Sequence, residues 1–512
     1  MRTKKAIINI IANVLVQITS IIIGLLVPKL LIVNYGSSIN GLIQMITQIV
    51  SYFGIIEGGV ATAAGAALYK PLVEKDYERI NQIMTAVKGF YIKTGIFFLI
   101  IGIILCIIYP FTIQREVNIV TSATIIFLLT IISISGYLIF NKYNMILVSD
   151  QNHYITLISS AIVNILVAIL QIILIYIKAN IILVVLMTPI LGLIRLIMLK
   201  KYVRYKYPYI TYKSNKPDNK AINKKWEALS LNVSQMCKIV IPLITLSFMF
   251  DLKTVSVYSV YSMVFRVGSS LIETIGNSLT ASFGNLIATD NEENLKRVYD
   301  ISETLILIFI SIISLGFFIL INSFIKIYIG TETDINYNSP ILAISFIINE
   351  AILNIRFSPK LILKAKGILK EVSKVSILEI ILCTILTPIF CYIYGYEAVL
   401  FGSIITGLIQ SVFMIVFVNI KILDIDIKII LKKIIINLTG IFISYYLIKL
   451  LFDMNPTGYI SFIIDIIVTG LITGLILLVF NYKFLNKHFM LLKEQFLNLV
   501  IKKGRKKENE CI

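Results

Sequence analysis

Charged residues are scarce in this sequence. Asp, Glu, Lys and Arg make up only 15% of its 512 residues, whereas an average soluble domain is about 25% charged. Hydrophobic residues make up 58%, and the mean hydropathy is +0.89. Because no water-soluble fold could cover so much apolar surface, we expect lipid to surround most of the chain.

Cysteine is scarce too, and its spacing is not that of a metal site or a disulfide framework. No CxxC pair occurs, and four of the five cysteines lie in apolar segments, where a thiol behaves as a small hydrophobic group. The five are Cys106, Cys237, Cys383, Cys391 and Cys511. We therefore expect no disulfide framework, no metal site and no cofactor.

Lysine and arginine outnumber the acidic residues, and the formal net charge is +19. Such a charge suits nucleic-acid binding only when it forms a basic face on a folded soluble domain. Here the basic residues lie between apolar runs. The sequence therefore predicts no nucleic-acid partner.

Apolar runs of roughly 20 residues, the length that crosses a hydrocarbon core, recur along the chain. We place helices at 6–33, 40–68, 91–108, 117–140, 154–176, 181–199, 226–250, 254–287, 305–329, 340–363, 375–394, 398–418, 434–451 and 459–480. The prediction is an all-α polytopic membrane protein with about 14 transmembrane helices.

The distribution of basic residues predicts the orientation, because cytoplasmic loops keep positive charge during insertion. With the N-terminus inside, few of the 47 lysines and arginines fall on the outer side. These are Arg115, Lys178, Lys253, Lys326 and Lys449. We therefore expect both termini in the cytoplasm.

The most basic loop, 200–225, contains Pro208 and Pro217 and is typical of a linker. It separates six helices from eight, so two pseudo-symmetric six-helix bundles would enter the membrane in the same sense. The expected parts are a bundle at 1–200, a basic cytoplasmic linker at 201–225, a bundle at 226–420, two further helices at 421–480 and a basic cytoplasmic tail at 481–512. Two such bundles are typical of an alternating-access transporter.

Polar residues inside the expected helices follow single faces, at steps of three and four. The clearest face, on the helix at 254–287, contains Tyr258, Ser262, Arg266, Ser269, Glu273 and Asn277. Similar faces contain Asn13 and Gln17 on the first helix and Gln44 on the second. These faces either join helices or line a water-filled cavity between the bundles. For small polar residues we favour helix contacts.

Cations deep in a membrane helix favour the cavity interpretation. Lys238, Arg266 and Arg356 are such cations, whereas Lys29, Arg195 and Lys360 lie nearer helix ends, where a long side chain can reach the interface. We expect Arg266 and Lys238 to hold an anionic head group. The acids Glu57, Glu273, Glu379 and Asp465 would pair with cations or couple transport to an ion.

Short motifs at the helix ends are similar to those of a known family. They include Pro28-Lys29, residues 36–42 (GSSINGL), Glu57-Gly58 and residues 68–72 (LYKPL). Others are residues 257–261 (VYSVY), residues 281–288 (ASFGNLIA), Arg356 before residues 365–367 (AKG), and Glu379. With these motifs the chain resembles bacterial polysaccharide flippases of the Wzx type, in the multidrug and oligosaccharidyl-lipid exporter superfamily, over most of the first twelve helices.

The resemblance implies a function and a place in the cell. The substrate would be an undecaprenyl-diphosphate-linked oligosaccharide repeat unit, moved to the outer leaflet of the bacterial inner (plasma) membrane for cell-surface polysaccharide biosynthesis. Partners would be membrane lipids and polysaccharide polymerase machinery. The resemblance also implies that Lys29 is a cavity cation and that the last two helices pack beside the bundle.

Several alternatives remain. A flippase for the peptidoglycan precursor would share this architecture, and a cation-coupled drug exporter would more commonly stop at twelve helices. A channel or a purely structural membrane protein also remains. An enzyme for the same glycans would be expected to have a large outer loop with catalytic residues. The sequence has only two histidines, His153 and His488, and both fall on the cytoplasmic side, so neither could be catalytic in such a loop. We therefore expect no enzyme activity.

Overall fold

The computed structural model describes residues 2–214, 216–219, 238–288, 292–330, 333–366, 368 and 370–484, and the described residues are helical without any strand. Their contacts divide the chain into two compact units. The first contains residues up to 263 with 331–337 and 376–399, and the second contains 264–330, 338–375 and the remainder from 400. The boundaries predicted from the sequence are not tested by this division and stay a prediction.

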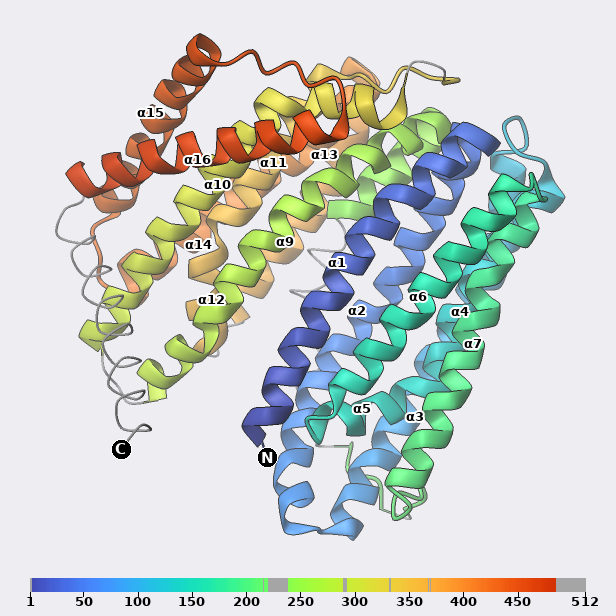
Figure 1. Ribbon diagram of the computed structural model, residues 1–512. Helices are drawn as coiled ribbons and strands as arrows, with labels where there is room; N and C mark the ends of the chain where they lie inside the picture. Colours follow the sequence, from blue (N-terminus) through green and yellow to red (C-terminus); the bar gives the residue numbers. More distant parts are fainter. Residues whose placement is uncertain are drawn as a thin grey trace, which may run out of the picture. The chain divides into compact units, whose positions relative to one another are not determined.

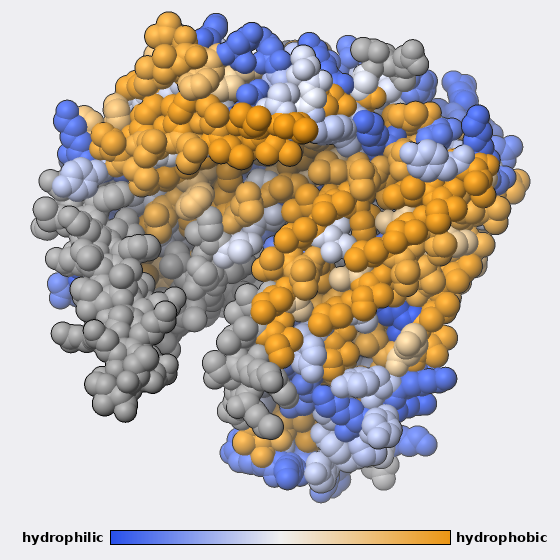
Figure 2. Space-filling view, viewed as in Figure 1, coloured by the Kyte–Doolittle hydropathy of each residue, from blue (hydrophilic) through white to orange (hydrophobic). Residues whose placement is uncertain are grey.

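The first unit begins with a bundle of long helices. They are α1 (Arg2–Tyr35), α2 (Ser37–Glu74), α3 (Tyr77–Thr112), α4 (Ile119–Ser135), the π-helical turn η1 (Gly136–Phe140), α5 (Asn141–Ser149), α6 (His153–Tyr176) and α7 (Ile181–Lys206). Helix α1 packs against α2 and α6, and α4 packs against α2, α3 and α7 (Figure 1). Apolar side chains cover the outward side of α1 and α6 in Figure 2, as expected for helices that face lipid.

The helix Lys238–Met249 completes the first unit together with parts of two longer helices. Helix α9 (Leu252–Ala288) and helix α13 (Lys370–Tyr394) each have residues in both units. The 3-10 turn η3 (Tyr396–Leu400) follows α13.

The second unit is formed around α10 (Glu292–Ile329). Its other helices are α11 (Pro340–Ile355), α12 (Phe357–Ala365), α14 (Phe401–Val416), the π-helical turn η4 (Phe417–Ile422), α15 (Ile427–Leu451) and α16 (Tyr459–Phe484). Helix α10 packs against α11, α15 and α16, and α11 packs against α14. The last two helices are therefore part of this unit, packed on α10 (Figure 1).

Short polar residues begin many of these helices. The side chains of Asp76, Asn118, Asn180 and Asp426 accept hydrogen bonds from backbone N–H groups of the first turn of α3, α4, α7 and α15. Between α1 and α2 the single residue Gly36 has φ +86°, which glycine adopts without strain. The chain can therefore reverse there with no longer loop, which places the start of α2 beside the end of α1.

The predicted fold class is confirmed. Among the described residues, twelve helices are long and apolar enough to cross a membrane. Together with α2 and the shorter helix Lys238–Met249, they account for the fourteen expected ranges, of which 226–237 lies outside the described residues. The expected span 340–363 contains a turn at Arg356 that divides it into α11 and α12. The expected starts of three helices were wrong: α3, α10 and α15 begin fourteen, thirteen and seven residues earlier.

Candidate functional site

Two of the predicted site residues form a buried ion pair in the first unit. Lys238 is the first described residue of the helix Lys238–Met249, and Glu379 lies in the part of α13 that belongs to the same unit. The lysine Nζ contacts the Glu379 carboxylate, and the residues are only 5% and 3% exposed. Since burying either charge alone is costly, each ion compensates the charge of the other.

The other predicted cations differ in burial. Arg356, which ends α11, is 6% exposed and donates a hydrogen bond to the Gln410 side chain of α14. Arg266 is exposed on α9 and has no hydrogen-bond or ion-pair partner within the described part of the chain. Lys29 is half-buried on α1. Lys29 and Lys238 belong to the first unit, whereas Arg266 and Arg356 belong to the second.

The predicted acids are not gathered at one place. Glu379 is paired with Lys238, while Glu273 is exposed on α9 and makes no ion pair with Arg266 as far as the structure describes the chain. Asp465 is half-buried on α16. The side chain of Glu57 lies outside the described residues.

The predicted polar residues also vary. Asn13 and Gln17 are exposed on α1, and Gln44 and Ser262 are half-buried. The hydroxyl of Ser269 donates to the Glu350 carboxylate and accepts a hydrogen bond from the Asn354 amide at 3.0 Å. Asn277 has a side chain outside the described part of the chain. Of this set, Ser269 therefore has the best-defined contacts, and they join α9 to α11.

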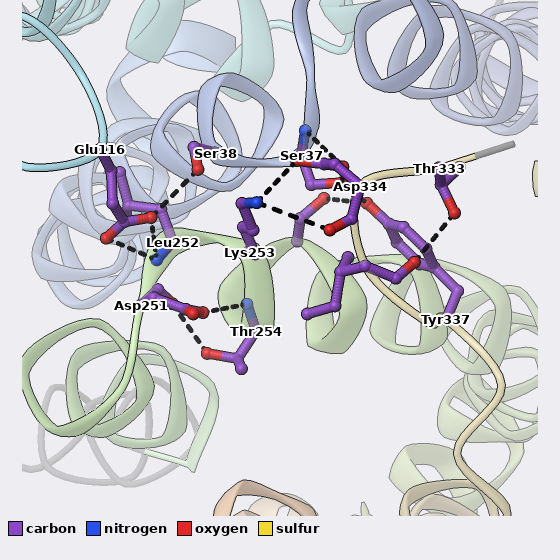
Figure 3. Close-up of polar contacts among 12 residues, drawn as sticks. Ser37, Ser38, Glu116, Asp251, Leu252, Lys253, Thr254, Thr333, Asp334 and Tyr337 are labelled. Atoms are coloured by element: carbon purple, nitrogen blue, oxygen red, sulfur yellow. Dashed lines mark hydrogen bonds and ion pairs between the residues drawn. The ribbon is translucent and has the colours of Figure 1, made fainter.

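Sequence reasoning missed a cluster at the ends of several helices of the first unit (Figure 3). We call it the outer polar cluster, because every segment in it lies on the outer side in the predicted topology. It consists of Ser37, Ser38, Asn40, Glu116, Lys253, Ser256, Asp334 and Tyr337. It joins the start of α2 and the loop after α3 to the start of α9 and to the segment 333–337.

Asp334 is central to one half of this cluster. Its carboxylate accepts a hydrogen bond from the Ser37 hydroxyl at 2.5 Å and lies 3.3 Å from Lys253 Nζ. Tyr337 then joins Ser37, at 2.7 Å, to Ser256, at 2.8 Å. Burial alone would raise the pKa of Asp334, but the bonds from Ser37 and the charge of Lys253 outweigh it and lower the pKa. This carboxylate therefore stays ionised at neutral pH.

Glu116 is central to the other half. Its carboxylate accepts hydrogen bonds from the backbone N–H of Leu252 at 2.9 and 3.1 Å and from the Ser38 hydroxyl at 3.0 Å. Leu252 begins α9, so the carboxylate lies at the positive end of the helix dipole. Burial raises the pKa of Glu116 and outweighs these hydrogen bonds.

Helices α2 and α9 approach each other closely at Gly41. A Cβ atom at Gly41 would lie 1.9 Å from the Leu252 carbonyl oxygen, so a larger residue requires a shift of the backbone. The signals in the sequence were the acidic residues Glu116, Asp251 and Asp334 in short loops, one of which also contains Lys253. Their proximity could not be read from spacing.

A second missed cluster lies in the second unit. Lys433 of α15 is fully buried and lies 2.6 Å from Asp300 and 2.9 Å from Glu303, both on α10. Glu303 also accepts a hydrogen bond from Tyr299 at 3.0 Å, and Tyr299 accepts one from Asn419 at 3.1 Å. The hydropathy pattern assigned Asp300, Glu303 and Lys433 to loops, because it began both helices after them.

The chain is similar to known proteins in its fold. No protein-family model matches the chain, and no curated protein matches it. A solved structure of the lipid II flippase MurJ in an inward closed conformation has a TM-score of 0.71 at 16% identity, covering 93% of this chain and 99% of its own.

Two other solved structures are similar over a smaller share of the chain. An inward-facing MATE family multidrug resistance transporter of the MOP superfamily has a TM-score of 0.56 at 12% identity, covering 79% of this chain and 94% of its own. A MOP superfamily transporter from Pyrococcus furiosus has a TM-score of 0.51 at 13% identity, covering 80% and 95%. The chain is therefore a multi-pass membrane protein with the helical fold that a lipid II flippase shares with transporters of the MOP superfamily.

Proposed function

We propose that the protein is a flippase that moves undecaprenyl-diphosphate-linked oligosaccharides from the cytoplasmic to the outer leaflet of the bacterial plasma membrane. The breadth of one structural match carries the choice of a lipid-linked substrate over a drug: the MurJ structure covers 93% of the chain, whereas the MATE structure covers 79%. The motifs shared with Wzx-type flippases support an oligosaccharide as the head group. A drug exporter would be expected to stop at twelve helices, and this chain continues with α15 and α16. Polysaccharide polymerase machinery is the proposed partner.

Charged side chains in membrane helices support an anionic substrate. A diphosphate needs cationic or amide donors once its water is removed. Arg266 is the proposed diphosphate ligand, because no described residue forms a hydrogen bond or an ion pair with its guanidinium. Lys29 and Arg356 are further proposed ligands, whereas Lys238 already has a carboxylate partner in Glu379.

A flippase for the peptidoglycan precursor is the second candidate, and the TM-score of 0.71 to a lipid II flippase favours it. Reconstitution separates the candidates. Purified protein in liposomes is given a fluorescent undecaprenyl-diphosphate oligosaccharide, lipid II or a cationic dye, and the probe that reaches the far leaflet or the lumen is measured. Flipping of the oligosaccharide supports the proposal. Flipping of lipid II alone, or transport of the dye alone, would replace it.

Variants of Arg266 test its role. Arg266→Gln should abolish flipping while the protein still inserts, and Arg266→Lys should keep part of the activity, because an anion ligand needs the positive charge. The double variant Arg266→Gln with Glu273→Gln is the matched control for simple charge balance. If it flips substrate normally at matched protein levels, Arg266 serves only to balance Glu273.

A further inference from the structure

A cavity of about 420 Å³ lies inside the first unit, with walls from α2, α4, η1, α5, α6 and α7. All of its lining residues belong to that unit. The polar part of the lining includes Ser133, Asn141, Asn144, Asn164, Thr188 and Arg195. One wall contains the π-helical turn η1, an irregularity that is frequent at functional sites.

Among the described residues that line this cavity, Arg195 is the only charged one. It lies fourteen residues after the start of α7, about 21 Å along the helix, and is half-buried. Its Nε donates to the Ser159 hydroxyl at 3.2 Å and one Nη donates to the Thr156 carbonyl at 3.0 Å. The guanidinium is therefore held by α6 at the cavity wall, rather than extended toward the membrane surface as its place in the sequence suggested.

Within the described part of the chain, no carboxylate compensates the charge of Arg195. Among the described residues it forms no ion pair, and no Asp or Glu lines the cavity. A guanidinium has five N–H donors, and the two bonds to Ser159 and Thr156 leave others available. An uncompensated cation within a membrane helix marks a functional site. An oxyanion matches the planar guanidinium in charge and in bidentate geometry.

We propose that this cavity binds an oxyanion of the transported head group, a sugar carboxylate or a phosphate, on Arg195, and this inference rests on the proposed flippase function. Asn164 of α6 and Thr188 of α7 supply polar groups for the rest of the head group. The site lies entirely in the first unit, whereas Arg266, the proposed diphosphate ligand, lies in the second.

Anion binding to the full-length protein in nanodiscs tests the site. Calorimetric titration uses sodium glucuronate and inorganic pyrophosphate as the two probes and glucose as the neutral reference. Binding of either anion, weakened about tenfold or more by Arg195→Gln and less by Arg195→Lys, is expected, because a charge-assisted bond is lost. The anion that binds more tightly identifies a carboxylate or a phosphate. Absence of anion binding, or equal binding by Arg195→Gln, would overturn the proposal.

Two further variants complete the experiment. Arg204→Gln makes the same chemical change on α7 at an exposed position outside the cavity lining and should leave anion binding unchanged. Asn164→Leu keeps the charge of Arg195 and alters an exposed cavity residue, so it tests the site even if Arg195→Gln does not fold. It should weaken binding several-fold, and unchanged binding would argue against the cavity.

The binding assay does not depend on transport, so the two proposals fail separately. If anion binding depends on Arg195 but no lipid-linked glycan is flipped, the anion site stands and the proposed flippase function is wrong. If the oligosaccharide is flipped but anion binding does not depend on Arg195, the flippase function stands and the anion site is wrong.

Discussion

Breaking the Lys238–Glu379 ion pair should be costly, because neither charge can reach water in the folded protein. The two residues are 5% and 3% exposed, and their charges contact each other directly. Glu379→Gln leaves the ammonium buried without its carboxylate, and Lys238→Met leaves the carboxylate without its cation. Removal of one partner from such a pair costs about 3–5 kcal/mol. We expect each single variant to lose that much unfolding free energy.

The double variant Lys238→Met with Glu379→Gln removes both charges and should recover most of the loss. Unfolding by SDS in mixed micelles, followed by circular dichroism, gives the four free energies of a double-mutant cycle. The pair Lys70–Glu74 is the matched control, because its nitrogen–oxygen distance is 3.7 Å but its side chains are 83% and 55% exposed. An exposed helical pair contributes only about 0.3–0.5 kcal/mol.

A cost below about 1 kcal/mol for Glu379→Gln would refute this reasoning, because it would mean that the two charges are hydrated in the folded protein. The same variants also distinguish a structural role of Lys238 from a role in substrate binding. A stable double variant that still flips substrate would exclude Lys238 as a diphosphate ligand, whereas a stable but inactive double variant would support Lys238 as such a ligand.

Three more predictions concern orientation, packing and pH. Reporter fusions at Ile512 and in the loop 200–225 should both report a cytoplasmic location, and an outside signal from either would contradict the predicted topology. Gly41→Ala should lower thermal stability by about 1–3 kcal/mol, because its methyl group would overlap the Leu252 carbonyl; an unchanged melting temperature would show that the helices separate readily. Burial raises the pKa of Glu116 above its ordinary value of 4.5, so the folded state binds this proton more tightly than the unfolded chain. The unfolding free energy that this proton contributes is complete below pH 4.5 and is lost as the pH rises through the raised pKa. Glu116→Gln should remove this fall in unfolding free energy, and an equal fall in the variant would assign it to another group.

Hydropathy predicted the number and order of the helices well, because the hydrocarbon core imposes a minimum length on every apolar run. It failed at their ends. Helix α10 begins at Glu292, thirteen residues before its expected start. A helix satisfies its own backbone hydrogen bonds and can continue with polar side chains beyond the apolar run, so a hydropathy window does not detect that extension.

The polar contacts were less predictable, because they depend on which helices become neighbours. The sequence placed Lys238 deep in a membrane helix, where a cation needs a partner or a function, but its partner Glu379 lies far along the chain. Glu116 and Asp334 fall between the expected helices, where the hydropathy pattern predicts no contact for them, although they receive several of the hydrogen bonds of the outer polar cluster. Periodicity assigns a residue to a face of its own helix, and it contains no information about the helix opposite.

The buried contacts of Lys433 determine where the chain can be shortened. Its ammonium lies against Asp300 and Glu303, so α15 is fastened to α10 by charge as well as by apolar packing. Deleting α15 and α16 to obtain a twelve-helix core would leave both carboxylates without this ammonium in a site built to exclude water. A shortened chain therefore needs neutral residues at both positions, and fusion partners are better attached after α16 than before α15.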